Sequence, residues 1–282
     1  MVALLLTSLS AALLAVIAGL ILSAFPLPVI ILTAIALVTL FAIFITSHHI
    51  QLVAARRRVR WPSSPPLAAT APPQHHDDYC LFVLGSGGHT REMLMMMDDG
   101  TCDFRRSHRR YLVTRGDAMS LHHLHAYEAS LTALCAARQT EPGTYDVVHV
   151  TRARRVHQSL LTTPLSALRS VLDIVPALLA RPEGSRRYPS LVFSNGPATG
   201  FFVAAVIYAL KVVGAVPAES MRFVYVESWA RISTLSLTGK LLHYTGLADF
   251  FAVQHAQVAA RYGVRDVGQV VFNARRDDIE HK

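Results

Sequence analysis

The longest stretch of this sequence without a charge lies at its N-terminus. No residue from Val2 to Ile45 carries a charged side chain. About 20 apolar residues span a bilayer, so this stretch exceeds one span and is nearly long enough for two. Pro26 and Pro28 interrupt it, because proline removes a backbone donor and restricts the preceding residue. We expect a membrane anchor over residues 1–55. It forms either a hairpin of two helices, Leu4 to Ala24 and Val29 to Ser47, or one span preceded by an apolar segment at the membrane.

A basic and then proline-rich segment follows the apolar stretch, over residues 56–78. Arg56, Arg57, Arg58 and Arg60 come first, and cationic flanks of membrane spans stay on the cytoplasmic side. The prolines between Trp61 and Asp78 stand among serine, alanine and threonine, which is typical of a linker. We therefore expect a separate folded domain, residues 79–282, that faces the cytosol.

The charge and cysteine content limit the classes of partner. The net charge of +8 suits nucleic acid or an anionic membrane surface. No nucleic-acid motif with interleaved aromatic residues is present, so the membrane is favoured. The 3 cysteines lack Cys-x-x-Cys spacing, which argues against a disulfide scaffold or a zinc knuckle. We expect no nucleic-acid partner, no cofactor and no metal held by this chain.

Short apolar segments alternate with longer helical patterns from Tyr79 onward. This alternation predicts an α/β fold with a Rossmann-like parallel sheet and helices on both faces. Ligands of such sheets bind where the strands end, so the segments that follow the strands are expected to converge at one edge. The strand candidates are Tyr79 to Leu84, Tyr111 to Thr114, Asp146 to Val150, Leu191 to Phe193, Phe223 to Val226 and Phe250 to Val253. The helix candidates are Thr90 to Asp98, Asp117 to Ala137, Gln158 to Ala180, Thr199 to Val213 and Thr234 to Tyr244.

A glycine loop follows the first predicted strand. Gly85, Gly87 and Gly88 lack a Cβ atom, so their backbone N–H groups can approach an anion at the positive end of a helix. A tight turn without a ligand is the alternative. A dinucleotide-binding turn would need glycine or alanine where Thr90 stands. His89 could act as a general base near neutral pH, contact a diphosphate, or cap the helix.

Two further segments follow predicted strands. Asn195, Gly196 and Pro197 could present a second set of backbone donors to the glycine loop, or simply cap the next helix. In the other segment, Glu227 could accept a sugar hydroxyl or act as a base, and Arg231 could bind phosphate. An internal ion pair between these two residues is the alternative.

Three other patterns allow two interpretations each. A helical stripe at Leu161, Leu165, Leu168, Leu172, Val175 and Leu179 is expected to pack on the sheet, with contact to a bilayer as the alternative. His122, His123, His125 and Glu128 could bind a metal, but a solvated helix face is favoured. The segment from Val267 to Phe272 could extend and pair with an edge strand of a partner.

Four strings in register behind the anchor resemble those of a known family. The sequence is similar to the membrane-anchoring subunit of the two-part UDP-N-acetylglucosamine transferase of dolichol-linked oligosaccharide synthesis, the asparagine-linked glycosylation 14 family. The strings are Val83 to Thr90, Asn195-Gly196-Pro197, Tyr225-Val226-Glu227-Ser228 and Leu235 to Lys240.

This resemblance implies the acceptor-side half of a GT-B glycosyltransferase that is inactive alone. Its soluble catalytic partner would carry the UDP-N-acetylglucosamine site. The complex would add the second N-acetylglucosamine to dolichyl-diphosphate-N-acetylglucosamine on the cytosolic side of the endoplasmic reticulum membrane, with the nuclear envelope as a further location. A membrane recruiter without catalytic residues and a membrane-bound nucleotide-cofactor-binding Rossmann protein are the alternatives.

The site residues follow from the resemblance and from the loops together. His89 and Glu227 are the catalytic candidates. The candidates for binding the acceptor diphosphate are Gly85, Ser86, Gly87, Gly88, Thr90, Asn195, Gly196 and Arg231.

Overall fold

The computed structural model of the chain describes residues 26–58, 79–98, 108–153, 163–185 and 187–273. It divides into two compact units, Met1–Val53 and Ala54–Lys282. The first predicted anchor helix and most of the proline-rich linker lie outside the described residues, so the choice between one span and two stays a prediction.

The apolar N-terminal stretch contains a long helix, α2, Leu27–Arg58. It starts where the sequence predicted a break, because Pro28 fits the first turn of a helix and the Pro26 carbonyl accepts a hydrogen bond from the Val29 N–H at 2.9 Å. It runs past the predicted end at Ser47 into the basic segment. Among the described residues, Leu27–Arg56 is long and apolar enough to cross a membrane, with a mean hydropathy of 2.8.

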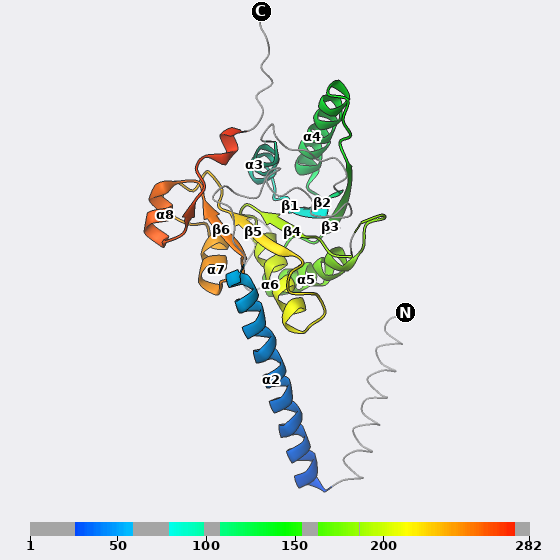
Figure 1. The fold of residues 1–282 in the computed structure, drawn as a ribbon, viewed down its shortest axis with the longest axis vertical. Coiled ribbons are helices and arrows are strands. Elements are labelled where there is room, and N and C mark those ends of the chain that lie inside the picture. Colours follow the sequence, from blue (N-terminus) through cyan, green and yellow to red (C-terminus); the bar gives the residue numbers. More distant parts are fainter. Residues whose placement is uncertain (1–25, 59–78, 99–107, 154–162, 186, 274–282) are drawn as a thin grey trace, which may run out of the picture. The chain divides into compact units, whose positions relative to one another are not determined.

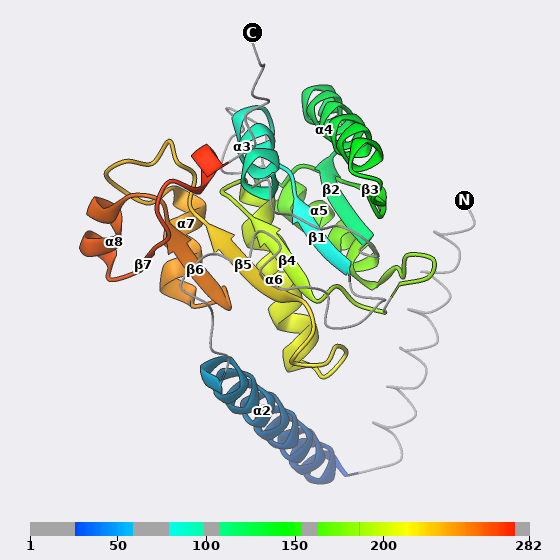
Figure 2. The ribbon, with the colours of Figure 1, turned by 45° about the horizontal axis from the view of Figure 1, so that its top comes forward.

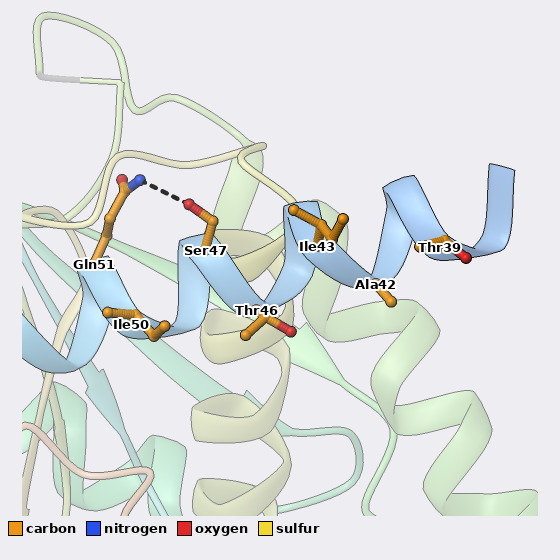
Figure 3. A pocket seen from close by; sticks show the side chains of 7 residues that line it. All are labelled: Thr39, Ala42, Ile43, Thr46, Ser47, Ile50 and Gln51. Carbon is orange, nitrogen blue, oxygen red and sulfur yellow. Dashed lines mark hydrogen bonds between the residues drawn. The ribbon is translucent and has the colours of Figure 1, made fainter. Parts of the chain in front are cut away.

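A shallow pocket lies along one side of α2 (Figure 3). The side chains that line it are either apolar or polar without a charge, so the pocket offers no acid, base or cation for catalysis. The lining residues are Thr39, Ala42, Ile43, Thr46, Ser47, Ile50 and Gln51.

The folded domain is built on one parallel sheet, as predicted. Its strand order is β3-β2-β1-β4-β5-β6-β7. Six strands correspond to predicted ones, and the short β7 was not predicted. The strands are β1 Tyr79–Val83, β2 His108–Thr114, β3 Thr144–Val150, β4 Leu191–Ser194, β5 Arg222–Val226, β6 Phe250–Val253 and β7 Arg265–Asp266.

Helices cover both faces of this sheet (Figures 1 and 2). α5, α6 and α7 lie on one face and α3 and α4 on the other, while α8 packs against β6 and β7. Strand side chains alternate between two buried apolar clusters, one on each face. The helices are α3 Gly88–Met97, α4 Ala118–Ala137, α5 Thr163–Leu179, α6 Ala198–Val212, α7 Leu237–Thr245 and α8 Ala256–Tyr262.

The prediction that Val267 to Phe272 extends as a free strand is wrong. Residues Val270–Asn273 form a short 3-10 helix, η1, that packs against α3. Val270 and Val271 are buried, and the Val271 N–H donates to Oε1 of Gln254 at 3.3 Å. The side chains of Val270 and Val271 are therefore used inside this domain, and the backbone from Val270 to Asn273 does not form a strand for a partner.

The predicted packing of the leucine stripe on the sheet is also wrong for its described middle part. Leu165, Leu168 and Leu172 are exposed, whereas Ile174 and Leu178 on the other side of α5 enter the core. Both sides of α5 are apolar, so the spacing of the leucines could not decide which side faces inward. Leu161 lies outside the described residues.

Candidate functional site

The sheet topology brings two predicted loops together. β1 lies between β2 and β4, so the chain leaves β1 towards one side of the sheet and leaves β4 towards the other. Their carboxyl ends form the topological switch point, which is where ligands of open parallel sheets bind. The loop of Gly85 to Gly87 follows β1, and the loop of Asn195 to Pro197 follows β4.

The two loops touch, and glycine makes the contact possible. A Cβ atom placed on Gly85 would stand 2.8 Å from Cβ of Pro197, and one placed on Gly196 would stand 2.7 Å from Cε1 of His89. Nδ2 of Asn195 donates to the carbonyl oxygen of His89 at 2.8 Å. His89 is therefore held between the first turn of α3 and the second loop.

The ring of His89 has an unusual polar environment. Its Nδ1 atom and Oδ1 of Asn195 are buried and have no hydrogen-bond partner among the described residues. Burial lowers the pKa of His89 below its ordinary value of 6.5, the backbone of Asn195 opposes this shift, and the positive charge of Arg231 adds to it. The imidazole is thus neutral at neutral pH. Because buried polar atoms are normally paired, the two atoms call for a water molecule or a ligand group as partner.

The outer side of the glycine loop is open. Ser86 and Gly88 are exposed, and a Cβ atom on Gly87 or Gly88 would meet nothing within 4 Å. Gly87 has a positive φ of 61°, which favours glycine. The backbone N–H groups at the start of α3 therefore face free space at the positive end of a helix, where an anion is stabilised.

Thr90 supports the loop from inside. Its side chain is fully buried, and its hydroxyl donates to the Gly85 carbonyl. The Ser120 hydroxyl donates to the same carbonyl at 2.9 Å and lies 2.8 Å from the Thr90 hydroxyl. The predicted diphosphate ligand Thr90 thus shapes the loop, and its hydroxyl contacts protein atoms.

Glu227 is enclosed by its own loop. It is 1 % exposed, and its Oε2 accepts from the N–H of Ser236 at 2.9 Å and from the Ser236 hydroxyl at 3.1 Å. Its Oε1 accepts from the Tyr225 hydroxyl and the Ser228 N–H, both at 3.1 Å. Burial raises the pKa of Glu227, and the hydrogen bonds from Ser236 oppose the shift. The carboxylate braces the loop, but through Ser236 and not through Arg231, which is exposed.

A second buried carboxylate, Glu92, was not predicted. It comes from α3 and accepts from the Ser228 hydroxyl at 2.8 Å, from the Trp229 N–H at 2.5 Å and from Nε2 of Gln254 at 2.9 Å. Burial raises the pKa of Glu92, and the nearby Glu227 adds to the shift. These contacts tie the loop after β5 to the helix that carries His89, so three predicted loops do converge at one edge of the sheet.

The sequence favoured a solvated helix face over a metal site for the histidines of α4 and Glu128, but Glu128 does not share that face. Glu128 points inward and binds Arg109 at 2.8 Å and 2.9 Å and the Tyr111 hydroxyl at 2.6 Å. The described part of the chain contains no group of three or more histidine, cysteine, aspartate or glutamate side chains arranged to hold a metal ion.

The fold and the site define a doubly wound α/β domain whose glycine loops meet at the topological switch point, an arrangement that suits a diphosphate group. A protein-family model described as "Oligosaccharide biosynthesis protein Alg14 like" matches residues 80–269. The chain belongs to this family.

Similar proteins carry consistent names. The "UDP-N-acetylglucosamine transferase subunit alg14" of Schizosaccharomyces pombe is 32 % identical over 223 residues, which is 79 % of this chain and 93 % of that protein. The ALG14 subunit of Cryptococcus neoformans is 37 % identical over 178 residues, 61 % of this chain and 71 % of that protein. The mouse subunit is 35 % identical over 182 residues, 64 % and 77 % respectively.

A solved structure is more distantly similar. The crystal structure of MurG from Acinetobacter baumannii matches with a TM-score of 0.37 and 10 % identity, covering 64 % of this chain and 43 % of that chain.

Proposed function

We propose that this chain is the membrane-anchoring, acceptor-binding subunit of a two-chain N-acetylglucosaminyltransferase. The complex adds the second N-acetylglucosamine to dolichyl-diphosphate-N-acetylglucosamine. Membership of the family and the names of the relatives support the reaction class. The observation that carries the site is the contact between His89 and the Asn195 to Pro197 loop, beside the open N–H groups of the glycine loop.

The acceptor diphosphate binds, in this proposal, on the outer side of the glycine loop. The N–H groups of Ser86, Gly87 and Gly88 donate hydrogen bonds to its oxygens, and the exposed guanidinium of Arg231 adds positive charge. Gly85, Thr90, Asn195 and Gly196 keep the two loops in the shape that this binding needs.

His89 is the base that this arrangement favours. The hydroxyl oxygen of the acceptor sugar forms a bond to C1 of the donor sugar, UDP leaves, and the proton of the hydroxyl passes to a neutral imidazole nitrogen. Glu227 was the other candidate, but all its contacts are internal and its side chain is enclosed. We assign it a positioning role in the loop after β5.

The donor site belongs to a separate soluble subunit. One parallel-sheet domain is too small for a complete two-domain GT-B enzyme, and the described domain uses its one switch point for the acceptor. α2 supports a membrane anchor, and the arginines at its end favour the cytosolic side for the domain. The endoplasmic reticulum as the membrane follows from the proposed reaction.

A second candidate function is a membrane recruiter without catalytic residues. The inward contacts of Glu227 and Thr90 favour it, because both side chains serve the fold. It differs from the first proposal in the expected behaviour of His89.

Transfer of labelled N-acetylglucosamine from UDP-N-acetylglucosamine to a short-chain polyprenyl-diphosphate-N-acetylglucosamine separates these functions. The assay uses the full chain alone, the candidate soluble partner alone, and both together. We expect product only with both chains, and loss of product with His89→Ala at unchanged complex formation. Full activity of the His89→Ala complex, or product with the partner alone, supports the recruiter, because the partner then supplies all the chemistry. Absence of product in every mixture contradicts both proposals for this chain.

A further inference from the structure

The apolar outer side of α5 has no covering element among the described residues. Leu165, Leu168 and Leu172 are 58 %, 56 % and 63 % exposed, although each lies on a helix whose opposite side is fully packed. Their spacing of three and four residues puts them on one side of the helix. Contiguous exposed apolar surface of this kind marks an interaction site.

The charges around these leucines favour an anionic lipid surface over a protein. Arg169 is exposed on the same stretch of helix. The acidic residue of α5, Asp173, is already engaged: its Oδ2 accepts from the N–H and the hydroxyl of Thr151 at 2.8 Å and 2.7 Å, and Arg115 lies 3.5 Å away. The exposed side of α5 is thus apolar and cationic, which is the composition of helices that lie in the membrane interface.

A bilayer is also within reach of this domain. α2 ends at Arg58 and β1 begins at Tyr79, and the chain between them can extend by no more than about 3.5 Å per residue. If α2 crosses a membrane, the domain therefore stays within about 70 Å of its surface.

The helices on the two faces of the sheet differ in how many large apolar side chains they expose, as a membrane contact on one face requires. α7 lies on the same face as α5 (Figure 1) and exposes Leu237, Leu241 and Tyr244. On the opposite face, Met119 is the one large apolar side chain that the described residues of α3 and α4 expose to a similar degree, at 61 %.

We propose that the Leu165, Leu168 and Leu172 face of α5 lies in the membrane interface as a second contact, independent of α2. The Ser166 hydroxyl donates to the carbonyl of Ala153 at 2.8 Å, which ties the start of α5 to the segment after β3, at the carboxyl edge of the sheet. The contact would hold the glycine loop beside the lipid surface. This inference goes beyond the proposed function, because it requires neither the partner nor any transfer reaction.

Photolabelling by lipid tests the contact directly. The full chain is reconstituted in vesicles of phosphatidylcholine and phosphatidylserine that contain a phospholipid with a diazirine near the glycerol. After irradiation, the labelled peptides are identified by mass spectrometry. We expect label in the peptides that carry α5, at about ten times the level in the peptide that carries α4, since only interfacial side chains approach the probe.

Variants make the result specific. The triple variant Leu165→Ser, Leu168→Ser, Leu172→Ser should lose the α5 label while the label in α2 stays. Met119→Ser, on the opposite face, should change neither. Arg169→Gln should reduce the α5 label in vesicles with phosphatidylserine and not in those without it. Circular dichroism confirms that the variants are folded.

Other outcomes overturn the proposal. Equal label in α5 and α4, or unchanged α5 label in the triple variant, shows that the leucines do not face lipid. Absence of α5 label together with protection of α5 from hydrogen exchange when the partner is added, or when the chain is concentrated, shows that a protein covers this face.

Discussion

A Cβ atom on Gly196 would lie 2.7 Å from Cε1 of His89, so the second loop and the imidazole leave no space between them. Gly196 also has a positive φ of 132°, which other residues rarely adopt.

Gly196→Ala should therefore displace His89 and strain the loop. We expect a loss of about 1–3 kcal/mol in the free energy of unfolding and a fall of about 100-fold in the transfer rate of the complex, because a small misplacement of a reacting group has that effect. Urea unfolding and the transfer assay measure the two quantities. Wild-type activity in this variant would show that His89 does not need its present position.

Gly88→Ala should behave differently, and it serves as the matched variant. Its Cβ would meet nothing within 4 Å, so stability should stay within about 0.5 kcal/mol of the wild type. The added methyl group would stand on the open side of the loop, where the acceptor diphosphate is proposed to approach. The KM for the acceptor should rise while the KM for UDP-N-acetylglucosamine stays the same. Unchanged KM values would place the diphosphate elsewhere.

Arg231 and His89 are linked through charge, which gives a pH prediction. A base must be deprotonated, and the pKa of His89 is lowered by burial and by Arg231. Activity should therefore persist below the ordinary histidine pKa of 6.5 and fall at lower pH. In Arg231→Gln the positive charge is gone, the pKa rises, and the acid limb of the pH–rate profile moves to higher pH.

Arg138→Gln is the control for this charge effect. Arg138 is exposed at the C-terminal end of α4, the end opposite Ser120, through which this helix contacts the glycine loop. Its profile should match the wild type. An acid limb that does not move in Arg231→Gln contradicts the assignment of the limb to His89.

Glu227 and Glu92 should make the stability of the domain depend on pH. Both have raised pKa values, so the folded state holds protons at a pH where the unfolded state has lost them. Their contribution is present below the ordinary glutamate pKa of 4.5 and is lost as pH rises through the folded values. Glu227→Gln should flatten this dependence. It should also destabilise the domain by about 1–3 kcal/mol, because the amide places donors against Ser236.

Gly239→Ala tests the same contact from the other side. A Cβ atom there would stand 2.0 Å from Oε2 of Glu227, so the carboxylate would have to leave the start of α7. We expect destabilisation similar to that of Glu227→Gln, with no further loss when the two changes are combined. Additive losses in urea unfolding would show that the two residues act separately.

The sequence was sufficient to predict the sheet and the edge at which the three loops meet. The central strands are short, apolar and rich in β-branched or aromatic residues, and the convergence of their carboxyl ends follows from parallel topology. The short β7 and α8 at the sheet edge have weak apolar patterns and were missed.

The buried contacts of individual side chains could not be predicted from the sequence in the same way. Glu92 lies on a helix, where glutamate is usually exposed, and nothing in its spacing indicates Ser228 and Gln254 as partners. Likewise, nothing local decides which of the two apolar sides of α5 is buried, or that Val270 turns back onto α3. Such choices depend on contacts between distant segments.

Direct binding of the acceptor to this chain, without its partner, is the measurement that tests the account most directly. The full chain in nanodiscs is titrated with short-chain polyprenyl-diphosphate-N-acetylglucosamine and, separately, with UDP-N-acetylglucosamine. We expect saturable binding of the lipid-linked sugar that is weakened by Gly88→Ala and by Arg231→Gln, and no binding of the nucleotide sugar. Binding of UDP-N-acetylglucosamine with no binding of the acceptor would contradict the assignment of the acceptor site to this chain.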